Sequence, residues 1–450
     1  MREQRIILDP FSLLDILECS GEVRADCHGY ISIKGHIDSR KEEQYIKILM
    51  DETWASVKVR DENGKEEILF SGIVTEGTIE VENSLRTLAL TIRTGSFLMD
   101  IKEHIRTFQS KSISYKSVMA ILMKSYDGRV LLTDKYNGKN TGRFLCQYQE
   151  NDWEFMLRLA GLCDAVLFPN YVQAGVKLFF GMPDGENRGE INPTEYYQKQ
   201  IQMNTVYGIK SREIYNIGDS VLFLGRKLYV ISRNTELEHG ELIHTYELMQ
   251  DVSGLSKKRC NNYLVGVSLK ATVTGVKGTE VTVSVVDDEN KNASGSKSFP
   301  YATVYSSPDG TGWYCMPETG DMVRIYFPSN DEEKAYALHS MHMESSDSNE
   351  RVNPDYKSFM NKQGKEVLLK PDSILITNNS GMSIELSDEE GISIISGKKI
   401  VFESEEAIEL TSVTDKIDIV APRKISLVQG NTQMVLSDKF TMRGGKIRLD

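Results

Sequence analysis

Residues 384–427 read IELSDEEGISIISGKKIVFESEEAIELTSVTDKIDIVAPRKISL, a stretch that repeats one short pattern of apolar residues. In each repeat two apolar residues lie two positions apart, and the pattern returns every eight residues with one step of nine. Polar residues and glycine fill most positions between them. A fixed period of this kind is typical of a repeat protein. The repeated apolar residues are Ile384, Leu386, Ile392, Ile394, Ile400, Phe402, Ile408, Leu410, Ile417, Ile419, Ile425, Leu427, Met434 and Leu436.

Each repeat predicts a short strand with one apolar face, because residues two apart project from the same side of a strand. Burying two such side chains contributes roughly 4 kcal/mol, whereas ordering the backbone of eight residues costs on the order of 8–16 kcal/mol. One copy is therefore not expected to fold alone. If three copies intertwine, all apolar pairs point into one shared core. We predict a triple-stranded β-helix over residues 362–450, with these fourteen residues as the trimer core. Ordinary meander hairpins or a single-chain solenoid remain the alternatives.

Upstream of the repeats, strand-like runs alternate with turns. Residues 1–100 predict a β-barrel, and residues 165–257 predict a second one. Between them, the helical segment over residues 101–164 contains two helices. The first runs from Tyr115 to Tyr126 with Gly128 as its stop, and the second follows Asn151 or Asp152 as N-cap.

A third β-unit is predicted over residues 258–343. The runs at 271–276 and 281–285 flank a Lys277-Gly278 turn and predict a hairpin. About five strands in this length suit a small closed barrel such as an OB-fold. A polar linker over residues 344–361 then leads to the repeats. The predicted fold class is therefore mainly β: two β-barrels with a small helical insert, an OB-fold barrel and a C-terminal intertwined trimeric β-helix.

Composition excludes several functions. The chain of 450 residues has 53 Lys and Arg against 65 Asp and Glu, a net charge of −12, which argues against nucleic-acid binding. No run reaches the roughly 18 apolar residues of a membrane-spanning helix, and the charged start does not resemble a signal peptide. We therefore expect assembly in the cytoplasm. The six cysteines show no C-x-x-C spacing, so we expect reduced, mostly buried thiols.

Four stretches carry a resemblance to a known family: LFSGIV at 69–74, ENDWEFMLRLA at 150–160, MPETGDMVRIYFP at 316–328 and NKQGK at 361–365. In this order they resemble the VgrG-type hub-spike proteins of contractile injection systems. That family includes phage tail hubs and spikes, phage-tail-like bacteriocins (tailocins) and type VI-like tips. The resemblance implies that the two β-barrels form a baseplate hub and that the β-helix forms a spike.

The resemblance also implies partners. A homotrimeric hub would adapt the hexameric tail tube, or tube-initiator proteins, to a threefold needle, and would meet baseplate and tape-measure proteins. During contraction the spike would puncture the target-cell envelope, as part of a virion or phage-tail-like particle. No lysozyme fits between the OB region and the repeats. We expect a PAAR-like tip protein to dock on the C-terminal residues Arg443, Lys446, Ile447, Arg448 and Leu449.

No catalytic, cofactor-binding or metal-binding residues are predicted. His339 and His342 have a metal-like spacing but no evident third ligand. The carboxylates at 388–390 and 403–406 fall in polar gaps between the apolar pairs, where solvated turns are expected. The alternative function is a trimeric β-helical tailspike or adhesin that acts on surface polysaccharide. Such proteins usually carry aromatic grooves, but from Gly381 onward only Phe402 and Phe440 are aromatic.

Overall fold

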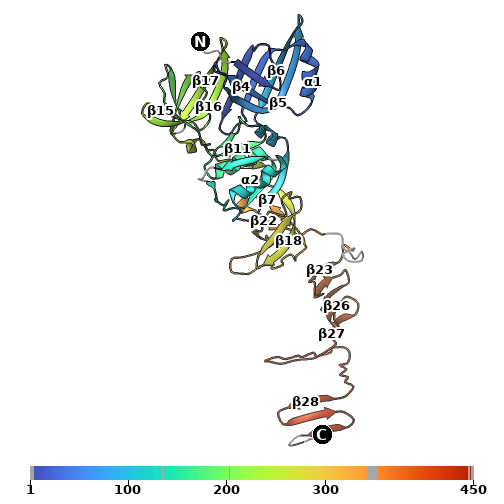
Figure 1. Ribbon diagram of the computed structural model, residues 1–450. Helices are drawn as coiled ribbons and strands as arrows, with labels where there is room; N and C mark the ends of the chain where they lie inside the picture. Colours follow the sequence, from blue (N-terminus) through green and yellow to red (C-terminus); the bar gives the residue numbers. More distant parts are fainter. Residues whose placement is uncertain are drawn as a thin grey trace. The chain divides into compact units, whose positions relative to one another are not determined.

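The computed structural model describes residues 5–126, 128–132, 136–201, 203–342, 353–443 and 446. The chain divides into two compact units, Met1–Met343 and Glu344–Asp450, here called the N-terminal and C-terminal units. The prediction of a mainly β chain is confirmed (Figure 1). Among the described residues, no helix is both long and apolar enough to cross a bilayer.

The N-terminal unit is built on one twelve-stranded sheet. Its strand order is β1-β4-β5-β6-β3-β2-β16-β17-β14-β13, with β15 beside β16 and β12 beside β15. Helix α1 (Glu42–Met50) lies between β3 and β4 in the sequence. The strands are β1 (Arg5–Asp9), β2 (Glu18–Arg24), β3 (Tyr30–His36), β4 (Trp54–Arg60), β5 (Glu66–Glu82), β6 (Leu85–Arg93), β12 (Asn187–Glu190), β13 (Tyr196–Ile201), β14 (Asn204–Ser211), β15 (Ser220–Phe223), β16 (Arg226–Glu238) and β17 (Glu241–Met249).

The two regions predicted as separate barrels share this sheet. Strand β2 of the first region pairs antiparallel with β16 of the second, from Arg24 opposite Ser232 to Ser20 opposite Glu236. Side chains alternate between buried and partly exposed along strands such as β3 and β4, and the buried ones form one core that includes Ile31, Val57 and Val230. The structure therefore differs from closed barrels: none of the sheets in the described residues closes on itself.

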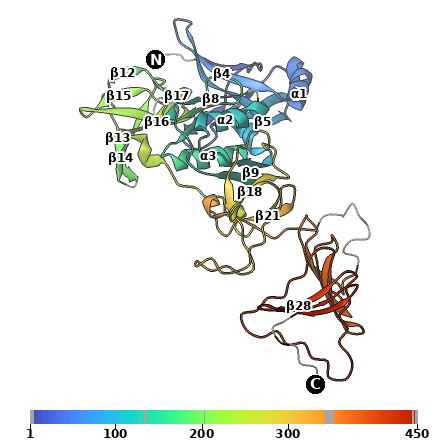
Figure 2. The ribbon, with the colours of Figure 1, turned by 90° about the horizontal axis from the view of Figure 1, so that it is seen from below.

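The helical segment lies between the large sheet and the β18–β22 sheet (Figures 1 and 2). Helix α2 (Tyr115–Met123) has Ser114 as N-cap, and a 3₁₀ turn from Lys124 to Tyr126 ends it before Gly128. Helix α3 (Asp152–Leu162) starts with a capping box, in which Asn151 accepts a bond from the Glu154 amide and Glu154 accepts one from the Asn151 amide. Both predicted helices are confirmed.

Two small sheets accompany these helices. The first pairs β7 (Glu103–Phe108) with β9 (Leu145–Asn151), and the second has the order β10-β11-β8. The strands of the second sheet are β8 (Arg129–Leu132), β10 (Leu167–Pro169) and β11 (Lys177–Phe180). Phe108, Phe155 and Phe180 lie in the core that they share with the helices.

The last part of the N-terminal unit is a five-stranded sheet with the order β20-β19-β18-β21-β22. The predicted hairpin is confirmed, with β18 and β19 joined at Lys277 and Glu280. A single bridge links Tyr301, just after β20, to Ala337 of β22. The strands are β18 (Ser268–Lys277), β19 (Glu280–Val285), β20 (Ser298–Pro300), β21 (Met322–Tyr326) and β22 (Tyr336–Leu338).

The C-terminal unit contains two antiparallel meanders. The first has five strands, β23 (Lys357–Met360), β24 (Glu366–Leu369), β25 (Ser373–Thr377), β26 (Met382–Ser387) and β27 (Gly391–Ser396). The second has three, β28 (Ile425–Gln429), β29 (Thr432–Leu436) and β30 (Phe440–Arg443). Residues 397–424 form no strand. Within one chain the pairing is thus that of hairpins, as in the meander alternative.

Candidate assembly interface

The first meander of the C-terminal unit has one apolar face made of cross-strand pairs. Ile376 lies opposite Ile384, and Leu386 lies opposite both Ile374 and Ile392. Residues directly opposite one another in a sheet project to the same side. The predicted residues Ile384, Leu386, Ile392 and Ile394 are therefore brought together on one face, and the eight-residue repeat is the reason for their alignment.

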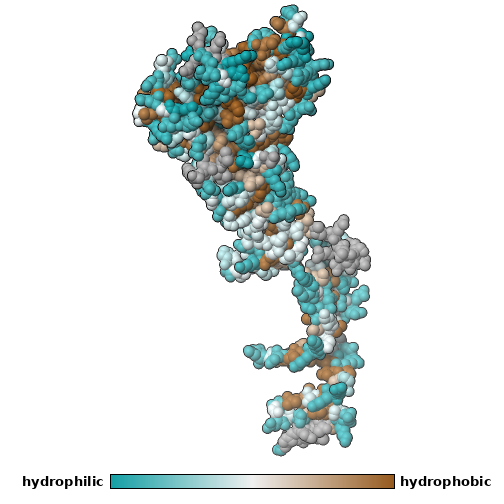
Figure 3. All heavy atoms as spheres, in the orientation of Figure 1, coloured by the Kyte–Doolittle hydropathy of each residue, from teal (hydrophilic) through white to brown (hydrophobic). Residues whose placement is uncertain are grey.

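This apolar face is uncovered in the single chain. Ile384, Leu386, Ile392 and Ile394 keep 40–74% of their surface exposed. Among the described residues of the C-terminal unit, only Ser373 is buried. Hydrophobic residues are visible along the surface of this unit in Figure 3. Contiguous exposed apolar surface of this kind marks an interaction site.

The remaining predicted core residues fall into two groups. Ile425 lies opposite Leu436, and Leu427 lies opposite Met434, so the second meander repeats the arrangement of the first. The other group lies in the strandless residues 397–424, where the structure does not bring the residues together in a sheet. These residues are Ile400, Phe402, Ile408, Leu410, Ile417 and Ile419, and all of them are exposed.

The predicted tip residues lie at the end of the second meander. Arg443 is the last residue of β30, and Lys446 is exposed. Ile447, Arg448 and Leu449 lie outside the described residues.

A buried ionic cluster joins the helical segment to the five-stranded sheet region, and it was missed at the sequence level. Arg158 of α3 donates to Glu150 over 2.8 and 2.9 Å and to Glu332. Its Nη2 also donates to the carbonyl of Cys146 over 2.9 Å. Burial disfavours the charge of Arg158, but the two carboxylates outweigh burial and raise its pKa. Burial raises the pKa of Glu150.

Other contacts strengthen the same junction. Phe144 of the helical segment lies in the core of the five-stranded sheet, with its ring centroid 5.4 Å from that of Phe299. The amide of Thr107 donates to Asp288 over 3.0 Å. His104 contacts Glu289 over 2.7 Å, and its other ring nitrogen lies 3.4 Å from Asp152. The helical segment and the sheet region are therefore built as one packed body.

One constellation has the residue types of a hydrolase triad. The ring nitrogens of His28 lie 2.8 Å from the Ser96 hydroxyl and 2.9 Å from the Asp100 carboxylate. However, Ser96 is 1% exposed and its hydroxyl also contacts Thr94 over 2.8 Å. The His28 ring packs on Trp153 with centroids 4.3 Å apart. A serine sealed in this way cannot reach a substrate, so we interpret the arrangement as a packing contact between β2–β3 and α3.

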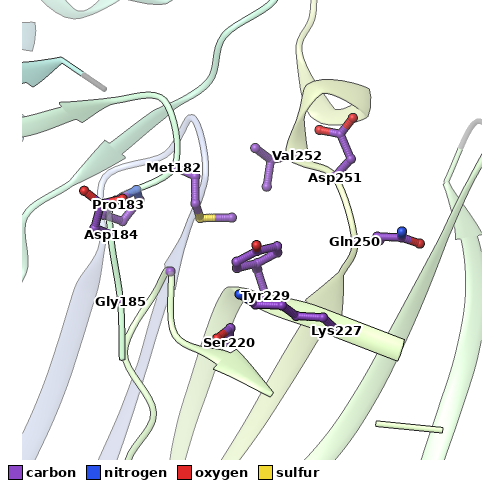
Figure 4. A pocket seen from close by; sticks show the side chains of 11 residues that line it. Met182, Pro183, Asp184, Gly185, Ser220, Lys227, Tyr229, Gln250, Asp251 and Val252 are labelled. Carbon is purple, nitrogen blue, oxygen red and sulfur yellow. The ribbon is translucent and has the colours of Figure 1, made fainter. Parts of the chain in front are cut away.

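A pocket of about 440 Å³ lies beside β15 and β16. Figure 4 shows Met182 and Tyr229 facing its middle, with Asp184 and Asp251 at its sides. Asp251 caps the short 3₁₀ helix Val252–Leu255 through the Ser253 amide at 2.9 Å, and the Lys227 amine lies 5.3 Å from the Tyr229 ring centroid. Asp251 and Lys227 thus make local structural contacts, and the lining contains no histidine or cysteine.

The described residues contain no cluster of three His, Cys, Asp or Glu side chains able to hold a metal. None of the six cysteines forms a disulfide. Cys19, Cys146 and Cys163 are buried, and burial raises the pKa of Cys19 to about 12. Cys260 and Cys315 are exposed, so the prediction of mostly buried thiols holds for only half of the set.

No protein-family model and no curated protein matches the chain. Several solved structures match the chain. A chain of the Francisella PdpA–VgrG complex in its half-lidded state has a TM-score of 0.57 at 9% identity, covering 88% of this chain and 88% of that one. A chain of the lidless PdpA–VgrG complex has a TM-score of 0.55 at 10% identity, covering 88% and 98%.

A third structure points the same way. The E. coli c3393 protein, a type VI secretion component similar to the bacteriophage T4 tail proteins gp27 and gp5, has a TM-score of 0.50 at 11% identity, covering 75% of this chain and all of that one. The chain therefore has the fold of VgrG-type hub and spike proteins, and the resemblance found in the sequence is confirmed at the level of the fold.

Proposed function

We propose that this protein is a structural hub and spike of a contractile tail or injection particle. Its fold supports this role, because VgrG-type and gp27/gp5-like structures share it over most of the chain. In this proposal three copies associate through the C-terminal unit, residues 258–343 act as an OB-fold adaptor, and the hub region meets the tail tube. The protein carries no catalytic activity and acts by mechanical penetration of the target envelope.

One observation carries the proposal: the described residues of the C-terminal unit bury no hydrophobic side chain. The repeat aligns its apolar side chains on one face, where they remain exposed. In a single chain, ordering the backbone of such a segment costs more free energy than the burial of its side chains recovers. Burial against two further copies supplies the missing core. The backbone of residues 397–424, which forms no ladder within the chain, gains strand partners in the same step.

The polar side chains fit this arrangement. The acidic residues 388–390 lie in the turn between β26 and β27 and are exposed. Charged turns on the outside of a trimer discourage the sideways association of exposed strands. In the proposal, a PAAR-like tip protein covers the last strands around Arg443 and Lys446.

Electron microscopy of the purified chain tests this function. We expect threefold particles with a thin rod formed by residues 362–450. A compact particle without threefold symmetry would contradict the hub and spike assignment. Mixing the chain with the PAAR-like protein of the same system tests the tip contact, and size-exclusion chromatography without co-elution would refute it.

A further inference from the structure

The segment between β20 and β21 contains a second exposed apolar surface, here called the aromatic arm (residues 302–316). The arm is held by its own hydrogen bonds. The Trp313 amide donates to the Tyr305 carbonyl over 2.8 Å, and the Ser307 amide donates to the Thr311 carbonyl over 2.9 Å. The Thr303 hydroxyl donates to the Trp313 carbonyl over 2.9 Å. The arm is therefore an ordered hairpin-like structure.

Gly312 fixes the close approach of the two sides of the arm. Its φ of 138° lies in a region that favours glycine, and a Cβ atom there would lie 2.5 Å from the Tyr305 carbonyl oxygen. Tyr314 anchors the base of the arm, because its hydroxyl donates to the Gly278 carbonyl over 3.1 Å. The side chains of the arm are thus displayed in a defined arrangement, which lowers the entropy cost of binding.

The displayed side chains are of the types that dominate protein interfaces. Val304 is 97% exposed and Tyr314 is 73% exposed, and Tyr305 and Trp313 are also exposed. Tyrosine and tryptophan are enriched among the residues that contribute most binding energy. Such a cluster on an ordered arm is an interaction surface.

We infer that the aromatic arm packs against a second copy of this chain, an inference that rests on the proposed trimer. The first argument is charge. The chain has a net charge of −12, but residues 302–316 carry a single charged side chain, Asp309. Like-charged copies repel one another wherever their charges meet, so a contact between copies is favoured on an uncharged surface.

The second argument is size. An aromatic side chain buries about 150–250 Å², so the four exposed apolar side chains supply on the order of 600 Å². A stable interface between free partners buries about 800 Å² on each side. The arm is therefore too small to hold a freely diffusing protein. It is large enough to bind a second copy of the chain that is already attached through the spike, because this attachment raises the effective concentration of the second copy to the millimolar range.

Two measurements on the full-length chain test this inference. The first is the rate of alkylation of Cys315, which is exposed within the arm of the single chain, with a free-thiol peptide as internal standard. We expect Cys315 to react at least tenfold more slowly in the trimer than in the I392D/I394D variant, whose spike is disrupted.

The second measurement places a photo-crosslinking amino acid at position 304, where Val304 is 97% exposed, in the otherwise unchanged chain. We expect covalent links between copies, with a yield that does not fall on tenfold dilution. A trimer in which Cys315 reacts as fast as in the variant, or in which links form only within one chain, overturns the arm contact but leaves the proposed function standing. Links that form only after a second protein is added also overturn it. A monomeric chain refutes both proposals.

Discussion

Arg158 and Glu332 form a buried ion pair although they lie 174 positions apart in the sequence. Arg158 belongs to α3, and Glu332 belongs to the short 3₁₀ helix Glu332–Lys334 that precedes β22. The same guanidinium holds Glu150, so one cation neutralises two buried carboxylates. The pair fixes the helical segment against the five-stranded sheet.

Removing Arg158 is expected to destabilise the N-terminal unit strongly. Arg158→Ala removes the guanidinium that both buried carboxylates, Glu150 and Glu332, contact, a loss that costs about 3–5 kcal/mol. Differential scanning calorimetry would show a clear drop in the melting temperature. The control is Arg60→Ala, because Arg60 pairs with Glu66 at an exposed site away from the cluster, where a much smaller loss of stability is expected. Equal shifts for the two variants would contradict the role of the cluster.

The contact between His104 and Glu289 predicts a pH-dependent contribution. Partial burial opposes the charge of Glu289, but the hydrogen bond and charge of His104, together with Arg106, outweigh it and lower the pKa of the carboxyl. A carboxyl with a lowered pKa stabilises the fold above its unfolded pKa, and this stability is lost as the pH falls through the folded pKa.

Glu289→Gln is therefore expected to lower the melting temperature at pH 7 and to have less effect below about pH 4. The carboxylate is 40% exposed, so the effect at pH 7 is about 0.5–1 kcal/mol. The exposed neighbour Asp287, changed to Asn, is the control and should have little effect at either pH. A Glu289→Gln effect that is the same at pH 7 and pH 3.5 would disprove this assignment.

The two faces of β27 are expected to respond differently to charge. Ile394 lies on the apolar face opposite Ile384, whereas Ile395 is opposite Ser383 on the other face. Ile394→Asp places three carboxylates in the proposed trimer core, at a cost of several kcal/mol. We expect this variant to dissociate at concentrations where Ile395→Asp stays associated, as measured by light scattering. If Ile395→Asp dissociates and Ile394→Asp does not, the apolar face has been assigned to the wrong side.

Gly312 is expected to control the order of the aromatic arm. Gly312→Ala forces a clash with the Tyr305 carbonyl, at a cost of about 1–3 kcal/mol. Gly310→Ala shares the strain of a positive φ, about 1–2 kcal/mol, but meets no neighbouring atom, so it is the control that isolates the effect of the clash. Limited chymotrypsin digestion would reveal cleavage in the arm several-fold faster for Gly312→Ala than for Gly310→Ala. Indistinguishable rates would show that this close approach does not hold the arm.

Local patterns in the sequence predicted local structure well. The polar cap at Asn151 and the apolar face that follows it predicted α3, and the Lys277-Gly278 turn predicted the β18–β19 hairpin. The eight-residue repeat predicted which side chains share a face. In each case the interactions that form the element lie within a few residues of one another, so the sequence displays them directly.

Long-range relationships were not predictable in this way. The pairing of β2 with β16 joins residues about 210 positions apart, and no local spacing encodes which strand edges will meet. Arg158 gave only a weak signal: it is the single basic residue of α3 and lies between Leu157 and Leu159. The partner that makes its burial possible comes from a different region of the chain.

The mass of the intact chain in dilute solution tests the central claim most directly. One chain has a mass of 50.9 kDa. If the C-terminal unit acquires its core from other copies, light scattering will give three times this value, and the mass will persist on dilution to nanomolar concentration. A species of single-chain mass with a protease-resistant segment at 362–450 would contradict the account, because that segment would then be stable without partners.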